Sequence, residues 1–391
     1  MKKRYLIIGA SAAGVSAAAK IRQLDTDAEI VCFTAEKEMP YNKCFLADYL
    51  SGLKTREQTA LRSETFFKEN NIELKLGTFI KDIDVKNKKI VCHEEREHFY
   101  TKLLLATGGS VQLPDLKGIK ADHVFSFYTL NDTQIILDYA RLHGVKKVVI
   151  IGAGLSGLEC ADSLRGFVES IEVVERENQI LSHQITEDGA EFIRQKMNEH
   201  GIAFTPNALV KEITKSSVLL EDGRALKADM VVCAIGARPN GKLGEKAGLM
   251  LNRGALVTDD FLATSNEHIF AAGDCAEVKD KITGKKVKSC TWPDAMLQGM
   301  VAGTNMVERS RLYPGVVIVT SSAFFGVKFF SAGNIKSHTS YNSSLCKDNE
   351  MYRFITHQNK IIKGFVLIGQ THGLAEFKRS LLTETPSALL E

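Results

Sequence analysis

The apolar positions of this chain alternate between two kinds of pattern. Short runs that are almost entirely apolar end in glycine clusters, and stretches with the spacing of an amphipathic helix follow them. One set predicts a strand over Lys3–Ile8, a helix from Val15 to about Leu24 and a strand over Glu29–Thr34. Another predicts strands over Lys147–Ile151 and Ser170–Val174 with a helix between them. Each set is a βαβ unit, so the sequence predicts an α/β fold with two Rossmann-like dinucleotide-binding domains.

A glycine-rich loop joins strand to helix in each unit. The first loop, residues 9–14, reads GASAAG, and the second, residues 152–157, reads GAGLSG, a complete G-x-G-x-x-G. The amides of such a loop and the dipole of the following helix face a pyrophosphate. Ser11 stands where the first loop would have its middle glycine, which weakens that match. Two copies in equivalent settings argue against the alternative, a tight turn without a ligand.

The end of the second unit bears on nucleotide preference. Its last strand is followed by Glu175, 23 positions after Gly152. A carboxylate there accepts the ribose hydroxyls of NADH and repels the 2′-phosphate of NADPH. Arg176 can instead contact such a phosphate, so NADPH stays as the less favoured alternative.

Three further segments complete the pattern. Residues 103–109 predict a strand that ends in Ala106-Thr107-Gly108, residues 231–240 a strand followed by Gly236, and residues 266–276 a strand that ends at Gly273-Asp274. With both loops in this order, essentially the whole chain resembles the two-dinucleotide-fold flavoprotein reductases, a family of pyridine nucleotide oxidoreductases. The resemblance implies FAD, reduced by NADH, and a glutathione-reductase-like fold with a small C-terminal α/β domain.

The same resemblance implies the cofactor contacts. Asp274 is expected to bind the ribityl chain or pyrophosphate region of FAD, an N-cap for a following helix being the plainer role. Glu36 is a weaker candidate for the FAD ribose, with a solvated loop charge as the alternative. Trp292 begins a helix expected to face the flavin pyrimidine ring, with core packing as the alternative. The expected cofactor-binding residues are Gly9, Ser11, Ala13, Gly14, Glu36, Lys43, Ala106, Thr107, Gly108, Gly152, Gly154, Leu155, Ser156, Gly157, Glu175, Gly236, Gly273, Asp274 and Trp292.

The segment Tyr41–Leu50 resembles two branches of the family. Tyr41, Asn42, Lys43 and Leu46 fit rubredoxin reductases and the FAD domain of NADH-dependent nitrite reductases. Cys44 falls where coenzyme A disulfide reductases and NADH oxidases or peroxidases carry one redox-active cysteine. Lys43 and the start of a following helix would favour its thiolate. An inert Cys44 that lines the flavin is the equally weighted alternative.

Several departures favour the first branch. The pair of cysteines separated by four residues is absent, and Ala12 and Ala13 stand where the peroxidases carry a loop histidine. Asp48 replaces the lysine of aromatic-oxygenase ferredoxin reductases. After about Glu308 only some 80 residues remain, with strands predicted over 316–320, 324–330, 351–356 and 361–368 and a helix from Gly373. Glu159 matches a glutamate near the nicotinamide in the disulfide reductases, an exposed helix residue being the alternative.

Charge and composition narrow the setting. The formal net charge of +3 gives no reason to expect nucleic acid as a partner. No run approaches the ~18 apolar residues of a membrane span, so a cytoplasmic protein is expected. Eight cysteines without a CxxC pair argue against a metal site or a secreted disulfide framework, and most are expected to be buried.

We therefore expect an FAD domain (1–110 and 237–308), an inserted NAD(P) domain (111–236) and a C-terminal interface domain (309–391). NADH would reduce FAD, which would pass electrons to rubredoxin or a ferredoxin-like iron–sulfur protein. The alternatives are a Cys44-dependent NADH oxidase, peroxidase or coenzyme A disulfide reductase, and a non-catalytic NADH-responsive scaffold. The oligomeric state, a homodimer included, stays open.

Overall fold

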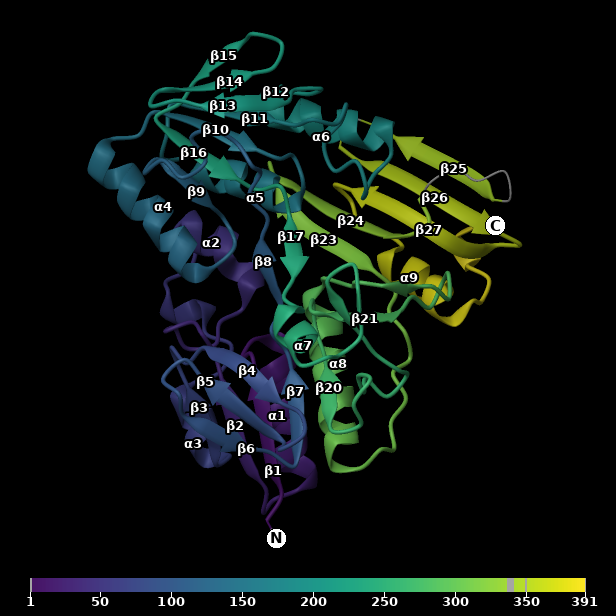
Figure 1. The fold of residues 1–391 in the computed structure, drawn as a ribbon. Helices are drawn as coiled ribbons and strands as arrows, with labels where there is room; N and C mark the ends of the chain where they lie inside the picture. Colours follow the sequence, from purple (N-terminus) through teal and green to yellow (C-terminus); the bar gives the residue numbers. More distant parts are fainter. Residues whose placement is uncertain (1, 336–340, 349, 391) are drawn as a thin grey trace. The chain divides into compact units, whose positions relative to one another are not determined.

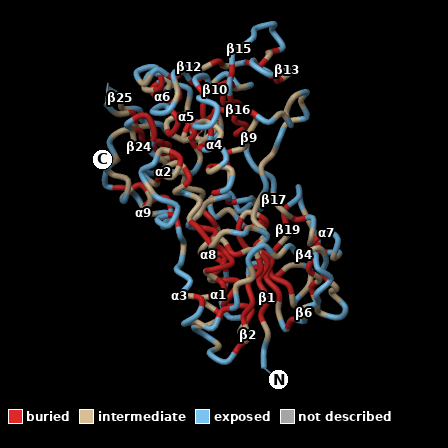
Figure 2. Tube along the Cα trace, turned by 90° about the vertical axis from the view of Figure 1, so that its left-hand side faces the viewer, coloured by how far each residue is buried: buried red, intermediate tan, exposed pale blue. Residues whose placement is uncertain are grey.

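The computed structural model describes residues 2–335, 341–348 and 350–390 (Figure 1). The chain forms two compact units. Unit 1 comprises Met1–Phe45, Thr55–Ser110 and Ala237–Val316, and unit 2 comprises Leu46–Lys54, Val111–Gly236 and Val317–Glu391. Buried residues gather around β1 in unit 1 and around β10 and β16 in unit 2 (Figure 2).

Unit 1 is built on a five-stranded parallel sheet in the order β20-β7-β1-β2-β3. Its strands are β1 (Arg4–Ile8), β2 (Glu29–Phe33), β3 (Ile72–Lys75), β7 (Lys102–Leu105) and β20 (Ile269–Ala271). Strand order reverses at β1, because β2 pairs on one side of it and β7 on the other. Ligands of such sheets bind at the carboxyl ends of the strands at this switch point.

Two helices of unit 1 pack backbone to backbone. They are α1 (Ala12–Leu24) and α8 (Trp292–Val307). A Cβ atom on Gly299 of α8 would lie 2.1 Å from the carbonyl oxygen of Ala13, and one on Gly303 would lie 2.7 Å from that of Ala17. Small residues on both helices therefore set the position of α1, which begins directly after the first glycine loop.

The remaining elements of unit 1 are shorter. They are η1 (Lys43–Phe45), η2 (Glu57–Thr59), α3 (Glu64–Glu69), β4 (Ile80–Asp84), β5 (Lys89–Cys92), β6 (Glu97–Phe99), β17 (Ala237–Pro239), α7 (Lys242–Lys246), β18 (Leu251–Asn252), β19 (Ala255–Val257), β21 (Ala276–Lys279) and β22 (Lys286–Val287). Asp274 lies between β20 and β21, so a strand follows it. The N-cap role considered for Asp274 is therefore wrong.

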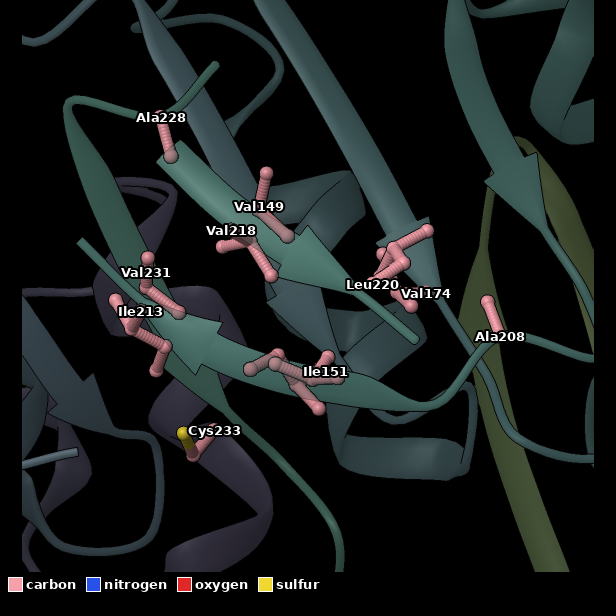
Figure 3. Close-up of a cluster of buried hydrophobic side chains, with 11 residues drawn as sticks. Val149, Ile151, Val174, Ala208, Ile213, Val218, Leu220, Ala228, Val231 and Cys233 are labelled. Carbon is pink, nitrogen blue, oxygen red and sulfur yellow. The ribbon is translucent and has the colours of Figure 1, made fainter. Parts of the chain in front are cut away.

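Unit 2 repeats the design with a parallel sheet in the order β12-β11-β10-β16-β9. Its elements before the C-terminal part are α2 (Leu46–Leu50), β9 (Val124–Ser126), α4 (Leu130–His143), β10 (Lys147–Ile151), α5 (Leu155–Leu164), β11 (Ser170–Val174), α6 (Glu187–Glu199), β12 (Ile202–Thr205), β13 (Val210–Ile213), β14 (Ser217–Leu220), β15 (Ala225–Lys227) and β16 (Met230–Cys233). β8 (Gly109–Val111) leads into this unit from unit 1. Side chains of β10, β11 and β16 meet those of β13 and β14 in a buried apolar cluster (Figure 3).

The C-terminal part of unit 2 is an antiparallel sheet in the order β23-β24-β27-β26-β25. Its elements are β23 (Val319–Phe324), β24 (Val327–Gly333), β25 (Asn342–Lys347), β26 (Tyr352–Gln358), β27 (Ile361–Ile368), α9 (Leu374–Thr383) and η3 (Ala388–Leu390). The strand predicted over 324–330 has the wrong bounds, because a turn at Phe325 and Gly326 interrupts it and joins β23 to β24. The three-domain division stays a prediction. Within the described residues, no helix has the length and apolar character that crossing a membrane requires.

Candidate cofactor and active site

The first glycine loop is fixed by its packing. Gly9 has φ +106°, and a Cβ atom there would lie 2.0 Å from the carbonyl oxygen of Ala106. A Cβ atom on Gly14 would lie 1.8 Å from the carbonyl oxygen of Gly9. The half-buried Ser11 precedes α1 without a capping hydrogen bond from its side chain. The loop therefore lies against the end of β7 and turns the first amides of α1 toward the switch point.

The second glycine loop contains a glycine that the protein itself does not require. Gly152 (φ +109°) and Gly157 are needed, because Cβ atoms there would lie 2.6 Å from the carbonyl oxygen of Ala234 and 2.0 Å from that of Gly152. Gly154 has φ −77°, and a Cβ atom there would meet nothing within 4 Å. Neither backbone strain nor packing explains this glycine, whereas the close approach of a pyrophosphate to the loop would do so. Leu155 and the exposed Ser156 follow in the first turn of α5.

Glu175 lies over this second loop. Its carboxylate accepts hydrogen bonds from the amides of Ala153 (2.8 Å) and Glu177 (3.1 Å), one to each oxygen. Each carboxylate oxygen can accept a further hydrogen bond, so capacity remains for ribose hydroxyls. Arg176 is exposed, and its guanidinium lies 3.3 Å from the carboxylate of Glu177.

Asn240, which follows the point where the chain re-enters unit 1, is hydrogen-bonded to the residues that follow β7. The Thr107 hydroxyl donates to the carbonyl of Asn240 (2.8 Å), and the Asn240 side-chain amide donates to the carbonyl of Thr107 (3.0 Å). The Ser110 hydroxyl also donates to the Asn240 side chain (2.8 Å). Ala106 is buried, and Gly108 takes φ +63°. The exposed Gly236 takes φ +99° in unit 2 just before this return.

Asp274 lies in a partly buried electrostatic cluster of unit 1. Burial raises the pKa of Asp274, the carboxylate of Asp294 raises it further, and the ammonium of Lys43 opposes both. Lys43 and Asp274, 231 positions apart, are thus brought close enough to interact. Trp292 begins α8 and is only half-buried, so it is not part of the closed core.

A buried polar chain that sequence reasoning missed holds the turn before Asp274. The Gly273 amide donates to the side chain of Gln298 (2.8 Å), which donates to Asp294 (2.5 Å), and Tyr313 donates to the other Asp294 oxygen (2.5 Å). Burial and the hydrogen bond to Asp294 raise the pKa of Tyr313, so it stays neutral. The available signal was the i, i+4 spacing of Asp294 and Gln298 on a largely apolar helix.

The predicted Tyr41–Leu50 segment divides between the units, with Tyr41–Phe45 in unit 1 and α2 in unit 2. Tyr41 is buried, and its hydroxyl donates to Glu36 (2.7 Å). The exposed Cys44 donates its amide hydrogen to the Asn42 side chain (3.0 Å). Glu36 is thus bound to the motif that carries Cys44 and is not a solvated loop charge.

Cys290 is a second exposed cysteine of unit 1, which sequence reasoning did not single out. It has φ +48°, unusual for a residue with a side chain. Desolvation and Asp274 raise the pKa of its thiol to about 11, against Lys288, which lowers it. Five of the eight cysteines are buried, and all eight lie in the described part of the chain without a disulfide.

Glu159 lies on α5 in unit 2 and is only partly exposed. The Ser322 hydroxyl of β23 donates to its carboxylate (2.6 Å). Burial raises the pKa of Glu159, Ser322 opposes that shift, and the charge of Asp48 on α2 adds to it. Glu159 is therefore not an ordinary exposed helix residue. Its carboxylate joins α5 to β23, and the like charge of Asp48 on α2 acts on it.

Comparison with known proteins places this geometry in a family. Residues 3–299 match the pyridine nucleotide-disulphide oxidoreductases. The chain is 36% identical to an NADH oxidase of Methanocaldococcus jannaschii over 80% of this chain and 72% of that protein. It is 30% identical to a rubredoxin-NAD(+) reductase of Pseudomonas putida over 79% of this chain and 81% of that protein. It spans only half of a longer relative, the assimilatory nitrate reductase electron transfer subunit of Bacillus subtilis, at 27% identity over 98% of this chain.

A solved structure agrees with the fold. The NAD-dependent persulfide reductase from A. fulgidus superposes with a TM-score of 0.89, covering 98% of this chain and 77% of that one at 27% identity. The chain belongs to the pyridine nucleotide-disulphide oxidoreductase family. It is an enzyme, an FAD-dependent NAD(P)H oxidoreductase, and its predicted fold of two Rossmann-like domains with a C-terminal α/β part is confirmed.

Proposed function

We propose that this enzyme oxidises NADH and passes the electrons to a small redox protein, a rubredoxin or a ferredoxin-like iron–sulfur protein. Each NADH then reduces two one-electron carriers and yields NAD⁺ and one proton. FAD, when bound, supplies the step between two-electron and one-electron chemistry. The chain itself binds and orients the two nucleotides.

The residues of unit 1 fit FAD. The Gly9 loop and the amides of α1 suit its pyrophosphate at the switch point of the sheet. Asp274, fixed by the Gly273–Gln298 hydrogen bond, suits the hydroxyl groups of the ribityl chain because a carboxylate accepts several hydrogen bonds. Desolvation of Asp274 makes hydroxyl donors from a ligand favourable partners.

The residues of unit 2 fit NADH. The open space at Gly154 suits the nucleotide pyrophosphate, and the Glu175 carboxylate suits two ribose hydroxyls. We infer that Glu159, held by Ser322, lies on the nicotinamide side of this site. Preference for NADH over NADPH rests on Glu175, because its negative charge repels a 2′-phosphate.

The spacing of the cysteines supports a one-electron carrier as the electron acceptor. No second cysteine follows Cys44 after four residues, so the two-cysteine disulfide centre of the disulfide reductases is not available there. Electrons then leave from FAD directly, as a single-electron carrier requires. The likeness to a rubredoxin-NAD(+) reductase, extending over 81% of that protein, supports this acceptor class.

A Cys44-dependent NADH oxidase, peroxidase or coenzyme A disulfide reductase is the second candidate. The observation that favours it is the exposure of Cys44 next to Lys43, whose charge reaches Asp274. The 36% identity to an NADH oxidase supports the same candidate. In this reaction the Cys44 thiolate would attack the substrate disulfide and release one thiolate, or attack a peroxide, break its O–O bond and release water. The resulting mixed disulfide or sulfenic acid would be reduced by NADH through FAD, which releases the second thiol or a second water and restores the thiolate.

An anaerobic NADH titration of the FAD-loaded protein separates the two candidates. We expect uptake of about one NADH per FAD without a long-wavelength thiolate-to-flavin band, and the same result for Cys44→Ser. Cys290→Ser serves as the matched control, since Cys290 is the other exposed cysteine of unit 1. Uptake of about two NADH, lost together with the band only in Cys44→Ser, would establish the second candidate instead.

A further inference from the structure

A lysine-rich β-hairpin projects from unit 1. It consists of residues 279–288, spans the end of β21 and all of β22, and is named here the lysine hairpin. The Asp280 amide donates a hydrogen bond to the backbone carbonyl of Lys285 (2.8 Å). The Asp280 carboxylate accepts a hydrogen bond from the amide of Ile282 (2.7 Å). Gly284 closes the turn at φ +69°. The hairpin is therefore an ordered element of the structure.

The charge of the lysine hairpin is concentrated and open to solvent. It holds five lysines and one aspartate, an excess of positive charge larger than the +3 of the whole chain. All five lysines are exposed, namely Lys279, Lys281, Lys285, Lys286 and Lys288. Among the described residues, no carboxylate lies within ion-pair distance of Lys279, Lys285, Lys286 or Lys288. Lys286 instead donates to the carbonyl of Thr258 (2.7 Å).

Four lysines elsewhere in unit 1 differ in this respect. Lys68, Lys75, Lys81 and Lys89 each form an ion pair with a neighbouring glutamate. The four hairpin lysines without a carboxylate partner repel one another and gain no folding stability from Coulomb attraction. The cluster therefore suits a negatively charged partner better than a structural role.

The lysine hairpin adjoins the proposed FAD site. Only Ser289, Cys290 and Thr291 separate it from α8. Lys288 lowers the pKa of the Cys290 thiol while Asp274 raises it, so both charges lie near the same sulfur atom. The last lysine of the hairpin is thus at the margin of the cluster that contains Asp274.

We propose that the lysine hairpin is the docking surface for the electron carrier and that it selects carriers with an acidic face. This inference rests on the proposed function, since it names the surface chemistry of the partner in that reaction. Complementary charges steer such a partner and speed its association, by a factor that falls as salt screens them. Docking at the margin of the Asp274 cluster brings the carrier close to the cofactor that supplies its electrons.

The test uses a charge reversal on the hairpin and a matched reversal elsewhere in unit 1. Lys281→Glu/Lys285→Glu changes the hairpin, and Lys68→Glu/Lys86→Glu makes the same change of charge at exposed lysines of α3 and the β4–β5 turn. Each FAD-loaded protein is titrated with a rubredoxin, an acidic carrier, at about 20 mM and about 300 mM salt. Rubredoxin binding is measured directly, and NADH-dependent rubredoxin reduction is measured in parallel.

We expect the hairpin reversal to weaken rubredoxin binding and raise KM for rubredoxin at least about tenfold at low salt, with the difference shrinking at high salt. Reduction of the flavin by NADH should stay unchanged, because these two side chains lie outside the cofactor contacts. The reversal at Lys68 and Lys86 should leave the affinity for rubredoxin and the KM for rubredoxin within about twofold of those of the unaltered enzyme. With basic cytochrome c as acceptor, the hairpin reversal should lower KM instead.

Two results would overturn this proposal. Equal effects of the two reversals would mean that overall charge, and not this surface, matters. Unchanged rubredoxin affinity with lost adhesion to phosphatidylglycerol vesicles would assign the hairpin to a membrane surface. If the unaltered enzyme binds rubredoxin at the hairpin but does not reduce it, the proposed function fails while the docking surface stands.

Discussion

Asp274 shows how a residue proposed to bind FAD reduces the stability of the protein that carries it. Desolvation is the largest cause of its raised pKa, and Asp294 adds to it. A carboxyl group whose folded-state pKa lies above the unfolded value stabilises the fold fully below the unfolded pKa. That contribution is lost as the pH rises through the folded-state pKa. At neutral pH the charged side chain is therefore unfavourable for the apoprotein.

We predict that Asp274→Asn raises the free energy of unfolding of the FAD-free protein at pH 7 by about 1 kcal/mol. The gain should shrink as the pH falls through the folded-state pKa and vanish only below the unfolded pKa of about 4, where the carboxyl is protonated in both states. FAD affinity should fall at least about tenfold, because a charged hydrogen-bond acceptor is lost. Urea unfolding at several pH values and FAD titration measure the two effects.

The control is Asp82→Asn, which removes an exposed carboxylate of β4 in the same unit. It should change neither the free energy of unfolding nor FAD affinity appreciably. A stability gain equal to that of Asp274→Asn would show that net charge, and not burial of Asp274, is responsible.

Gly154 and Gly157 lie three positions apart in the second glycine motif, and different physical reasons account for the glycine at each position. We predict that Gly154→Ala leaves the free energy of unfolding within about 1 kcal/mol of the original value, because a methyl group there meets no protein atom. NADH binding should weaken at least about tenfold, since the methyl group occupies the approach to the loop. Fluorescence titration with NADH and urea unfolding give the two numbers.

Gly157→Ala supplies the contrast. Its methyl group would lie 2.0 Å from the Gly152 carbonyl oxygen, so α5 must move away from the end of β10. We expect a loss of at least about 2 kcal/mol in stability. Equal NADH affinity in the Gly154→Ala protein and the original would contradict the explanation given for Gly154.

At the scale of elements, the contact between α1 and α8 sets the position of the first loop. We predict that Gly299→Ala costs at least about 2 kcal/mol in free energy of unfolding, because its methyl group would lie 2.1 Å from the Ala13 carbonyl oxygen. FAD affinity should fall as well, since α1 begins directly after the loop. Gly166→Ala, where no protein atom lies within 4 Å, is the matched control and should be neutral.

The sequence predicted the elements of both Rossmann-like sheets closely because buried parallel strands are continuous apolar runs. The strands over Lys147–Ile151 and Ser170–Val174 have the predicted bounds, and α1 begins three residues earlier than expected. The C-terminal sheet was harder. β25 is a polar, exposed edge strand without an apolar run, and the turn at Phe325 contains an aromatic residue where turn-forming residues are expected.

The candidate site was predictable only in part for a related reason. Glycine loops and Gly-Asp turns are local patterns, whereas the Gly273–Gln298–Asp294–Tyr313 chain joins residues up to 40 positions apart. Ser322 reaches Glu159 from β23, 163 positions away. Such partners carry no local signal, because any hydroxyl or amide of suitable length serves once the fold places it there.

At the scale of the whole molecule, each expected cofactor site belongs to one compact unit. The Gly9 loop and Asp274 lie in unit 1, and Gly154 and Glu175 lie in unit 2. Each unit has about 200 residues and its own parallel sheet. A ligand that binds only the folded form of one unit stabilises that unit, by about 2.7 kcal/mol at a hundredfold excess over Kd.

We therefore predict that calorimetry of the FAD-free protein resolves two unfolding transitions that respond to different ligands. FAD at a hundredfold excess over Kd should raise one transition, and NADH the other, by about 5–10 °C for units of this size. At the same ligand concentrations, Gly154→Ala should reduce the response to NADH by about half or more and keep the response to FAD, while Asp274→Asn should do the reverse. If FAD and NADH raise the same transition equally in all three proteins, the two units unfold as one. Binding of FAD or NADH would then stabilise the whole chain and not the one unit that contains its site.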